Sequence, residues 1–201
     1  QTTVRAHQSA KGWQVPDARV RVHGRLRARP LELRAAGSGL VDQMRLETLI
    51  ARSGESRLSA AGELADGDLD FQWRLRSPDL SDIHPDLAGQ AEGDGTLGGG
   101  MTEPRVTADL EADGLAFAET EMGGLRLSAN GTPAAHELTL AADHPQGKAR
   151  LAVAGGWRPQ EGAWQFRLTE GLLDPARFPA WRLTEPADGR LSTETGELEE
   201  A

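Results

Sequence analysis

A glycine motif at residues 93–98, GDGTLG, has the residue types and spacing of a dinucleotide-binding loop. Such a loop binds pyrophosphate only where it follows a buried strand and opens a helix, because the N–H groups at the helix N-terminus contact the phosphates. Gly99, Gly100 and Pro104 follow this motif, so no helix can begin there. We therefore assign these glycines to a turn or to narrow positions in a sheet.

Three aspartates, Asp66, Asp68 and Asp70, resemble the beginning of a calcium-binding loop. Phe71 stands where that loop needs its glycine, and Ser77 stands where it needs its closing glutamate. The spacing therefore fails for calcium, and a hairpin turn explains these residues better.

A second acidic group contains Asp79, Asp82 and Asp86 together with His84. Prolines on both sides of this group indicate that Asp79 and Asp82 are turn and cap residues. The five histidines have no metal-ligand spacing, cysteine is absent, and no serine lies in a nucleophile elbow. The sequence thus predicts no catalytic residue, no metal site, no cofactor and no enzyme activity.

The elements that carry these residues are predicted to be strands. From residue 18 to residue 29, apolar or small residues alternate with arginines and one histidine, which is the period of a strand with one buried and one solvated face. Two similar runs, 58–64 and 69–75, flank Asp66-Gly67 and predict a β-hairpin. Residues 40–50 fit the spacing of a helix and of a strand equally well, and we favour a strand because every neighbouring run is one.

Turns are expected wherever these alternating runs end. One run ends at Asn130-Gly131 and another at residues 144–147, His-Pro-Gln-Gly. The sequence therefore predicts a long antiparallel meander with one apolar face.

Charge and composition narrow the classes of function. A net charge of −9 argues against nucleic-acid binding. Residues 1–60 carry a net charge of +6 and the remaining residues −15, so the first segment either contacts anionic lipid headgroups or is a solvated outer face, and we favour the face. No apolar run approaches the roughly 18 residues of a membrane span. The chain begins with Gln1, and we expect residues 1–201 to form one elongated β domain, a fragment of a larger protein.

The apolar face of a long meander must be covered, by closure as a barrel, by pairing as a sandwich, or by curling into a groove around a ligand. Small residues at inward positions favour the groove over the default of closure, and we expect it to be widest or least regular within residues 77–117. The residues expected to line it share the inward positions of the strands: Val20, Val22, Leu26, Leu58, Leu64, Leu69, Phe71, Trp73, Leu75, Val106, Leu110, Leu125, Leu127, Leu138, Leu140, Leu151, Val153, Trp164, Phe166 and Leu168.

Several phrases in the sequence resemble a known family. They are SPDLS at residues 77–81, PDLAG at 85–89, GTL at 95–97 and PRV at 104–106, followed by GGW at 155–157, WQFRL at 164–168 and WRLTEP at 181–186. Together they resemble the TamB family of AsmA-like bridge-type proteins, best from about residue 58 to residue 191. The resemblance places the chain in the internal or C-terminal half of such a protein.

The resemblance implies an all-β fold, a curled and elongated U-shaped sheet called a β-taco, with an apolar inner groove. It implies a periplasmic segment of a protein anchored in the inner membrane, and a partnership of the full-length protein with TamA, an outer-membrane barrel of the BamA family. It also implies phospholipid transport between inner and outer membranes, with acyl chains in the groove, and support of outer-membrane protein assembly. Two alternatives stay open: a chaperone-like scaffold that templates outer-membrane strands, and a closed structural sandwich such as an adhesin module.

Overall fold

Alternating apolar and polar side chains produce strands along almost the whole chain. The computed structural model describes the backbone of residues 2–9, 12–26, 29–40, 43–118, 120–192 and 198–200, and side chains within residues 17–25, 29–39, 43–118 and 120–192. Its only helix in that part of the chain is a single 3₁₀ turn, η1 (Leu80–Asp82). The prediction of an all-β chain is confirmed.

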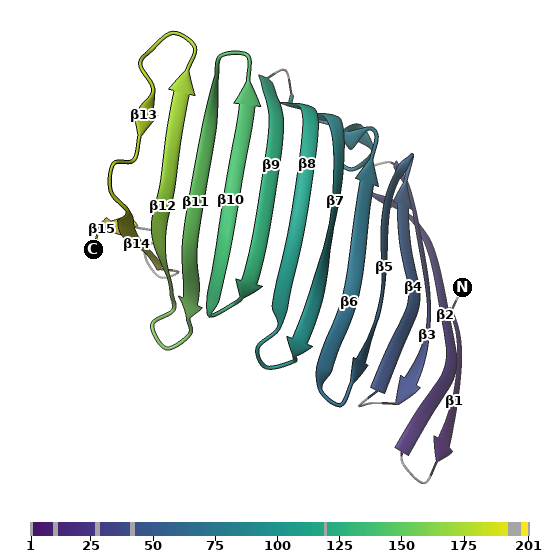
Figure 1. Cartoon of the computed structure of the whole chain (residues 1–201). Coiled ribbons are helices and arrows are strands. Elements are labelled where there is room, and N and C mark those ends of the chain that lie inside the picture. The colour runs from purple at the N-terminus through teal and green to yellow at the C-terminus, as the bar shows by residue number, and fades with distance from the viewer. Residues whose placement is uncertain are drawn as a thin grey trace.

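The strands follow one another with short connections (Figure 1). In chain order they are β1 (Thr2–Ser9), β2 (Gly12–Leu26), β3 (Arg29–Leu40), β4 (Gln43–Ser53), β5 (Ser56–Ala65), β6 (Asp68–Ser77), β7 (Leu87–Gly100), β8 (Arg105–Phe117), β9 (Thr120–Thr132), β10 (Ala135–His144), β11 (Gly147–Arg158), β12 (Ala163–Pro175), β13 (Trp181–Arg182), β14 (Ala187–Ser192) and β15 (Leu198–Glu200). The ambiguous run at residues 40–50 is a strand from Gln43 onward, as predicted.

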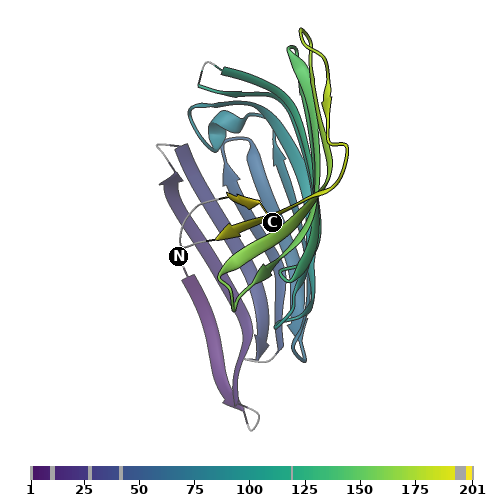
Figure 2. The ribbon, with the colours of Figure 1, turned by 90° about the vertical axis from the view of Figure 1, so that its left-hand side faces the viewer.

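All of these strands belong to one antiparallel sheet in which each pairs with its neighbour in sequence up to β12. β13 and β14 both pair with β12, at opposite ends of it, and β15 pairs with β14. Within the described residues β1 and β15 do not pair with each other, so the sheet stays open. Figure 2 shows a curved sheet with two walls, and β14 and β15 turn from the C-terminal edge toward the N-terminal wall. The closed sandwich is therefore the wrong alternative for this chain.

Turn chemistry explains where the chain reverses. Asp66 and Gly67 connect β5 to β6 with positive φ angles of 54° and 86°, so the predicted Asp-Gly hairpin is confirmed. The turn predicted at Asn130-Gly131 is wrong, because β9 continues through both residues and the chain reverses only at residues 133 and 134. Gly131 has φ 137°, and a Cβ there would overlap the backbone of the next strand, so this glycine serves close strand approach.

The register aligns apolar side chains from strand to strand across the sheet. One line of directly paired residues crosses from β2 to β12, and we call it the central apolar row. Its members, in order, are Val22, Leu33, Ala51, Leu58, Leu75, Gly93, Leu110, Leu127, Leu140, Leu151 and Gly171. Because side chains alternate between faces, all of these residues belong to one face.

The apolar face is the inner face of the curve. Ser53 and Ser77 occupy that face, since they pair with Leu31 and Ala91 respectively, and both contact the segment that contains η1. Figure 2 shows η1 inside the curve. Among the described side chains, the buried apolar residues are Leu80, Ala91, Val153 and Ala163. No second layer of this chain packs on the described inner face, and most of its large apolar side chains are half-buried rather than buried.

Candidate functional site

The inner face brings together the side chains that the sequence selected. The register places all of the predicted lining residues on this face, from Val20 in β2 to Leu168 in β12, except Leu26, whose side chain lies outside the described residues. The role of these residues in lining a lipid path stays a prediction.

Large apolar side chains on this face are open to solvent. Val22 keeps 45% of its surface exposed, Leu151 keeps 40%, and Val106 keeps 39%. They belong to strands β2, β11 and β8, so accessible apolar surface extends over the length of the sheet. Several large apolar side chains exposed on one face of a sheet are typical of a binding surface.

The glycines of β7 lie beneath large neighbouring side chains, and the expected width of the groove at this strand stays a prediction. The ring of Trp73 lies over Gly95 and the side chain of Leu110 lies over Gly93, where a Cβ would overlap them. Each missing side chain lets a large neighbour lie flat across the sheet. Gly89 (φ 105°) lies within a register shift between β7 and β8, but similar shifts occur in β2–β3, β3–β4 and β4–β5, so the expected irregularity of this stretch stays a prediction.

An aromatic cluster lies on the inner face near the turns that follow β9 and β11. The Trp164 indole N–H donates to Nε2 of His136 at 2.8 Å, and the planes of the two rings are nearly parallel, at 7°. Phe166 stacks on Trp164 with ring centroids 4.7 Å apart. Nδ1 of His136 lies 3.1 Å from the Thr132 carbonyl oxygen, so the neutral tautomer with its proton on Nδ1 satisfies every polar group. Sequence reasoning missed His136 because only the register shows that it faces inward.

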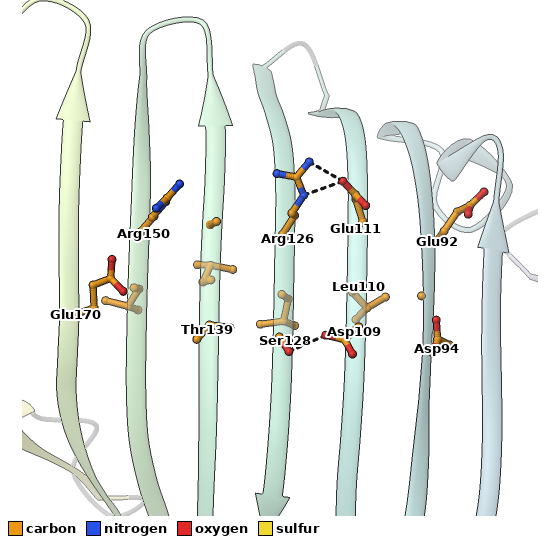
Figure 3. Close-up of a pocket in the computed structure, with 15 residues that line it drawn as sticks. Glu92, Asp94, Asp109, Leu110, Glu111, Arg126, Ser128, Thr139, Arg150 and Glu170 are labelled. Carbon is orange, nitrogen blue, oxygen red and sulfur yellow. Dashed lines mark hydrogen bonds and ion pairs between the residues drawn. The ribbon is translucent and has the colours of Figure 1, made fainter.

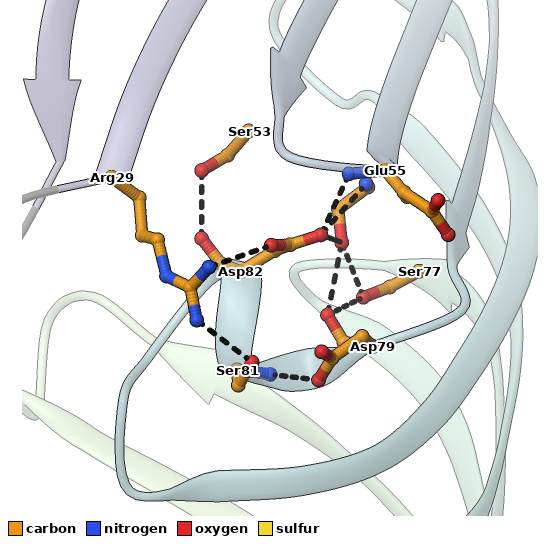
Figure 4. A network of polar contacts seen from close by, with 8 residues as sticks. Arg29, Ser53, Glu55, Ser77, Asp79, Ser81 and Asp82 are labelled. Atoms are coloured by element: carbon orange, nitrogen blue, oxygen red, sulfur yellow. Dashed lines mark hydrogen bonds and ion pairs between the residues drawn. The ribbon is translucent and has the colours of Figure 1, made fainter.

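A buried carboxylate holds one rim of the inner face (Figure 4). Only 5% of Asp82 is exposed, and its Oδ2 accepts the backbone N–H of Glu55 at 2.7 Å and that of Ser56 at 3.3 Å. Its Oδ1 lies 3.7 Å from the Arg29 guanidinium. We call this group the Asp82 hub. It ties η1 to the turn between β4 and β5 and to the beginning of β3, so Asp82 is more than the turn or cap residue that was predicted.

Asp79, its neighbour in the same segment, has the local role that was predicted for it. It is the N-cap of η1, where its side chain accepts the backbone N–H of Ser81 at 2.9 Å. This hydrogen bond holds the pKa of the Asp79 carboxyl below its usual value.

The outer face of the same strands has the opposite chemistry. A shallow hollow of about 550 Å³ lies on this face. Figure 3 shows the two lines of charged and polar side chains that line it across β7 to β12. Arg126 donates to Glu111 at 2.8 Å, and Ser128 donates to Asp109 at 2.6 Å. The hydrogen bond with Glu111 raises the pKa of Arg126. These exposed groups bind one another and water, which is typical of a solvated face.

The described residues contain neither a group of metal-binding side chains nor a helix that could span a membrane. No three histidine, aspartate or glutamate side chains of that part of the chain are grouped so that they could hold a metal ion. None of its helices has the length and apolar composition needed to cross a membrane.

A protein family matches the first two thirds of this chain. Residues 1–128 match the family described as TamB, N-terminal domain. Over 114 residues the chain is 32% identical to the translocation and assembly module subunit TamB of Haemophilus influenzae, an alignment that covers 55% of this chain and 9% of that protein. No solved structure matches the chain.

Proposed function

The chain belongs to the TamB family, since the family match covers more than half of it, and we propose that its inner face shields the acyl chains of phospholipids. The matched domain is an N-terminal one and begins at residue 1, whereas the sequence phrases had placed the chain in an internal or C-terminal half and had fitted best after residue 58. The family is thus confirmed, and the expected position within it is corrected.

The central apolar row is the observation that carries this proposal. It crosses strands β2 to β12 without a polar side chain, and its members are paired residue to residue. A hydrocarbon chain that lies along this row contacts carbon at each strand. Burial of each methylene is worth about 0.8 kcal/mol, so a chain can be held without a specific polar contact and can still slide.

The wider setting of the chain is part of the same proposal. The alignment covers less than a tenth of the Haemophilus protein, whose name describes a subunit of a translocation and assembly module. We place the chain as one elongated domain of a longer protein that is anchored in the inner membrane and extends through the periplasm. Its full-length partner would be an outer-membrane barrel of the BamA family, TamA, and its action would support both phospholipid delivery and assembly of outer-membrane proteins.

A pair of adjacent substitutions tests the proposal. Leu127→Arg places a charge in the central apolar row, whereas Ser128→Arg places the same charge on the outer face next to Asp109. In cells that depend on the full-length protein, Leu127→Arg should stop the movement of labelled phospholipid to the outer membrane. Ser128→Arg should leave this movement unchanged. Equal rates for both variants, at equal protein levels, would refute the groove as the lipid path.

A further inference from the structure

A hollow interrupts the inner face at the C-terminal end of the central apolar row. It has a volume of about 500 Å³. Gly171 occupies the position that leucine holds in the four preceding strands of the row, so the hollow lies where that side chain would be. Only Leu183 and Leu168 come within 4 Å of the place where a Cβ on Gly171 would stand.

The path of the chain after β12 builds the far wall of this hollow. β13 pairs with the end of β12, so that Trp181 stands opposite Leu173. The backbone N–H of Leu183 then donates to the Gly171 carbonyl oxygen at 2.8 Å, and the chain leaves the ladder until β14 begins at Ala187. The edge of the sheet therefore leaves the ladder beside Gly171, and the side chains of Leu183 and Leu168 lie next to this glycine.

The side chains that line the hollow determine which kind of ligand it can bind. Leucine side chains and the Trp181 ring make up most of the lining, and two arginines, Arg150 and Arg182, also belong to it. Trp181 and Leu173 are 73% and 52% exposed, although both are large and apolar. The backbone groups of β11 at this point are already paired with β12. A hydrocarbon chain suits this lining because it brings no N–H or C=O group that needs a partner, whereas a peptide brings both.

We propose that this hollow is a holding site for the end of one acyl chain, with Trp181 at its rim. The proposal rests on the proposed function and adds one fixed holding site to an otherwise uniform apolar row. A chain end seated over Gly171 gains contact with walls on both sides, whereas elsewhere the row offers only a floor. Lipid should therefore pause at this end of the segment.

Quenching of tryptophan fluorescence by a brominated lipid tests the holding site directly. The full-length protein is loaded from vesicles of a phospholipid with bromine on its acyl chains, and the vesicles are removed by flotation. Bromine quenches only a tryptophan that it touches, so the Trp181→Phe variant reports the share that belongs to Trp181. Trp73→Phe reports the share at the middle of the inner face, where Trp73 covers Gly95.

Filling the hollow completes the test. Gly171→Leu should weaken binding at Trp181 about tenfold, which corresponds to the contact of roughly two methylenes, and should leave quenching of Trp73 intact. Gly24→Leu is the matched control, because Gly24 lies on the inner face of β2 with nothing within 4 Å of its Cβ position. Quenching of Trp73 without Trp181, or no effect of Gly171→Leu, would overturn the holding site and leave the lipid path standing. No quenching of either tryptophan would overturn both.

Discussion

The meander is interrupted at two places, the rim at η1 and the hollow at Gly171. Polar groups fill the first, whereas apolar side chains surround open space at the second. At the rim, the connection between β6 and β7 is held by the buried Asp82 carboxylate, and the polar groups around it have partners within the chain. At the hollow, the break between β13 and β14 leaves aliphatic and aromatic side chains with open space between them. An interruption whose polar groups find partners within the chain has a structural role, whereas one that leaves apolar surface open has room for a ligand.

Removal of the Asp82 carboxylate should have the largest effect on stability. Asp82→Ala leaves two backbone N–H groups and the Arg29 guanidinium without their acceptor, which should cost about 2–4 kcal/mol of unfolding free energy. Chemical denaturation of the purified protein measures this loss. Asp79→Ala, which removes the exposed N-cap of η1 three residues earlier, is the control and should cost clearly less. Equal losses would show that the hub is no more than a local cap.

The turn that Asp82 contacts gives a second way to break the rim. Gly54 has φ 56°, and a Cβ there would collide with the Asp82 carboxylate, so Gly54→Ala should destabilise the protein by roughly 1–2 kcal/mol. Gly24→Ala should lie within about 0.5 kcal/mol of the parent, because its Cβ meets no atom. Thermal melts of the two variants compare the sites. A neutral Gly54→Ala would contradict the close fit of the hub.

The outer face should give the smallest effect. Arg167 donates twice to Asp188, at 2.7 and 2.8 Å, and this hydrogen bond holds the pKa of Asp188 below its usual value. The pair therefore adds stability that is fully present above the unfolded pKa of about 3.9 and is lost as pH falls through the lower folded pKa. When the melting temperature is measured as a function of pH, the Asp188→Asn variant should lose slightly less stability in acid than the parent protein does. An unchanged profile would mean that the pair contributes nothing.

Much of the fold follows from local rules. Period-two alternation predicts most strands, and because the period is two it also decides which side chains share a face, from Val20 to Leu168. The Asp66-Gly67 hairpin needs only the two residues that form it. The prediction of a turn at Asn130-Gly131 is wrong because these residues also serve close contact between strands. A local rule does not distinguish the two uses.

The remaining features depend on residues far apart in the sequence. The Asp82 hub joins backbone groups at Glu55 and Ser56 to a carboxylate 26 or 27 positions later. The Trp73 ring over Gly95 and the open space over Gly171 follow from pairing between strands and from neighbouring rotamers. Neither appears in a single strand, so the sequence identifies the inner face but not where that face is filled or hollow.

Photo-crosslinking at two adjacent positions of β9 tests the central claim most directly. A photoreactive amino acid replaces either Leu127 on the inner face or Arg126 on the outer face of the full-length protein in living cells. We expect phospholipid adducts at position 127 and none at position 126. Absence of lipid at position 127, or equal capture at both positions, would contradict the claim that the inner face carries acyl chains. Capture of outer-membrane protein without lipid would instead favour the scaffold alternative.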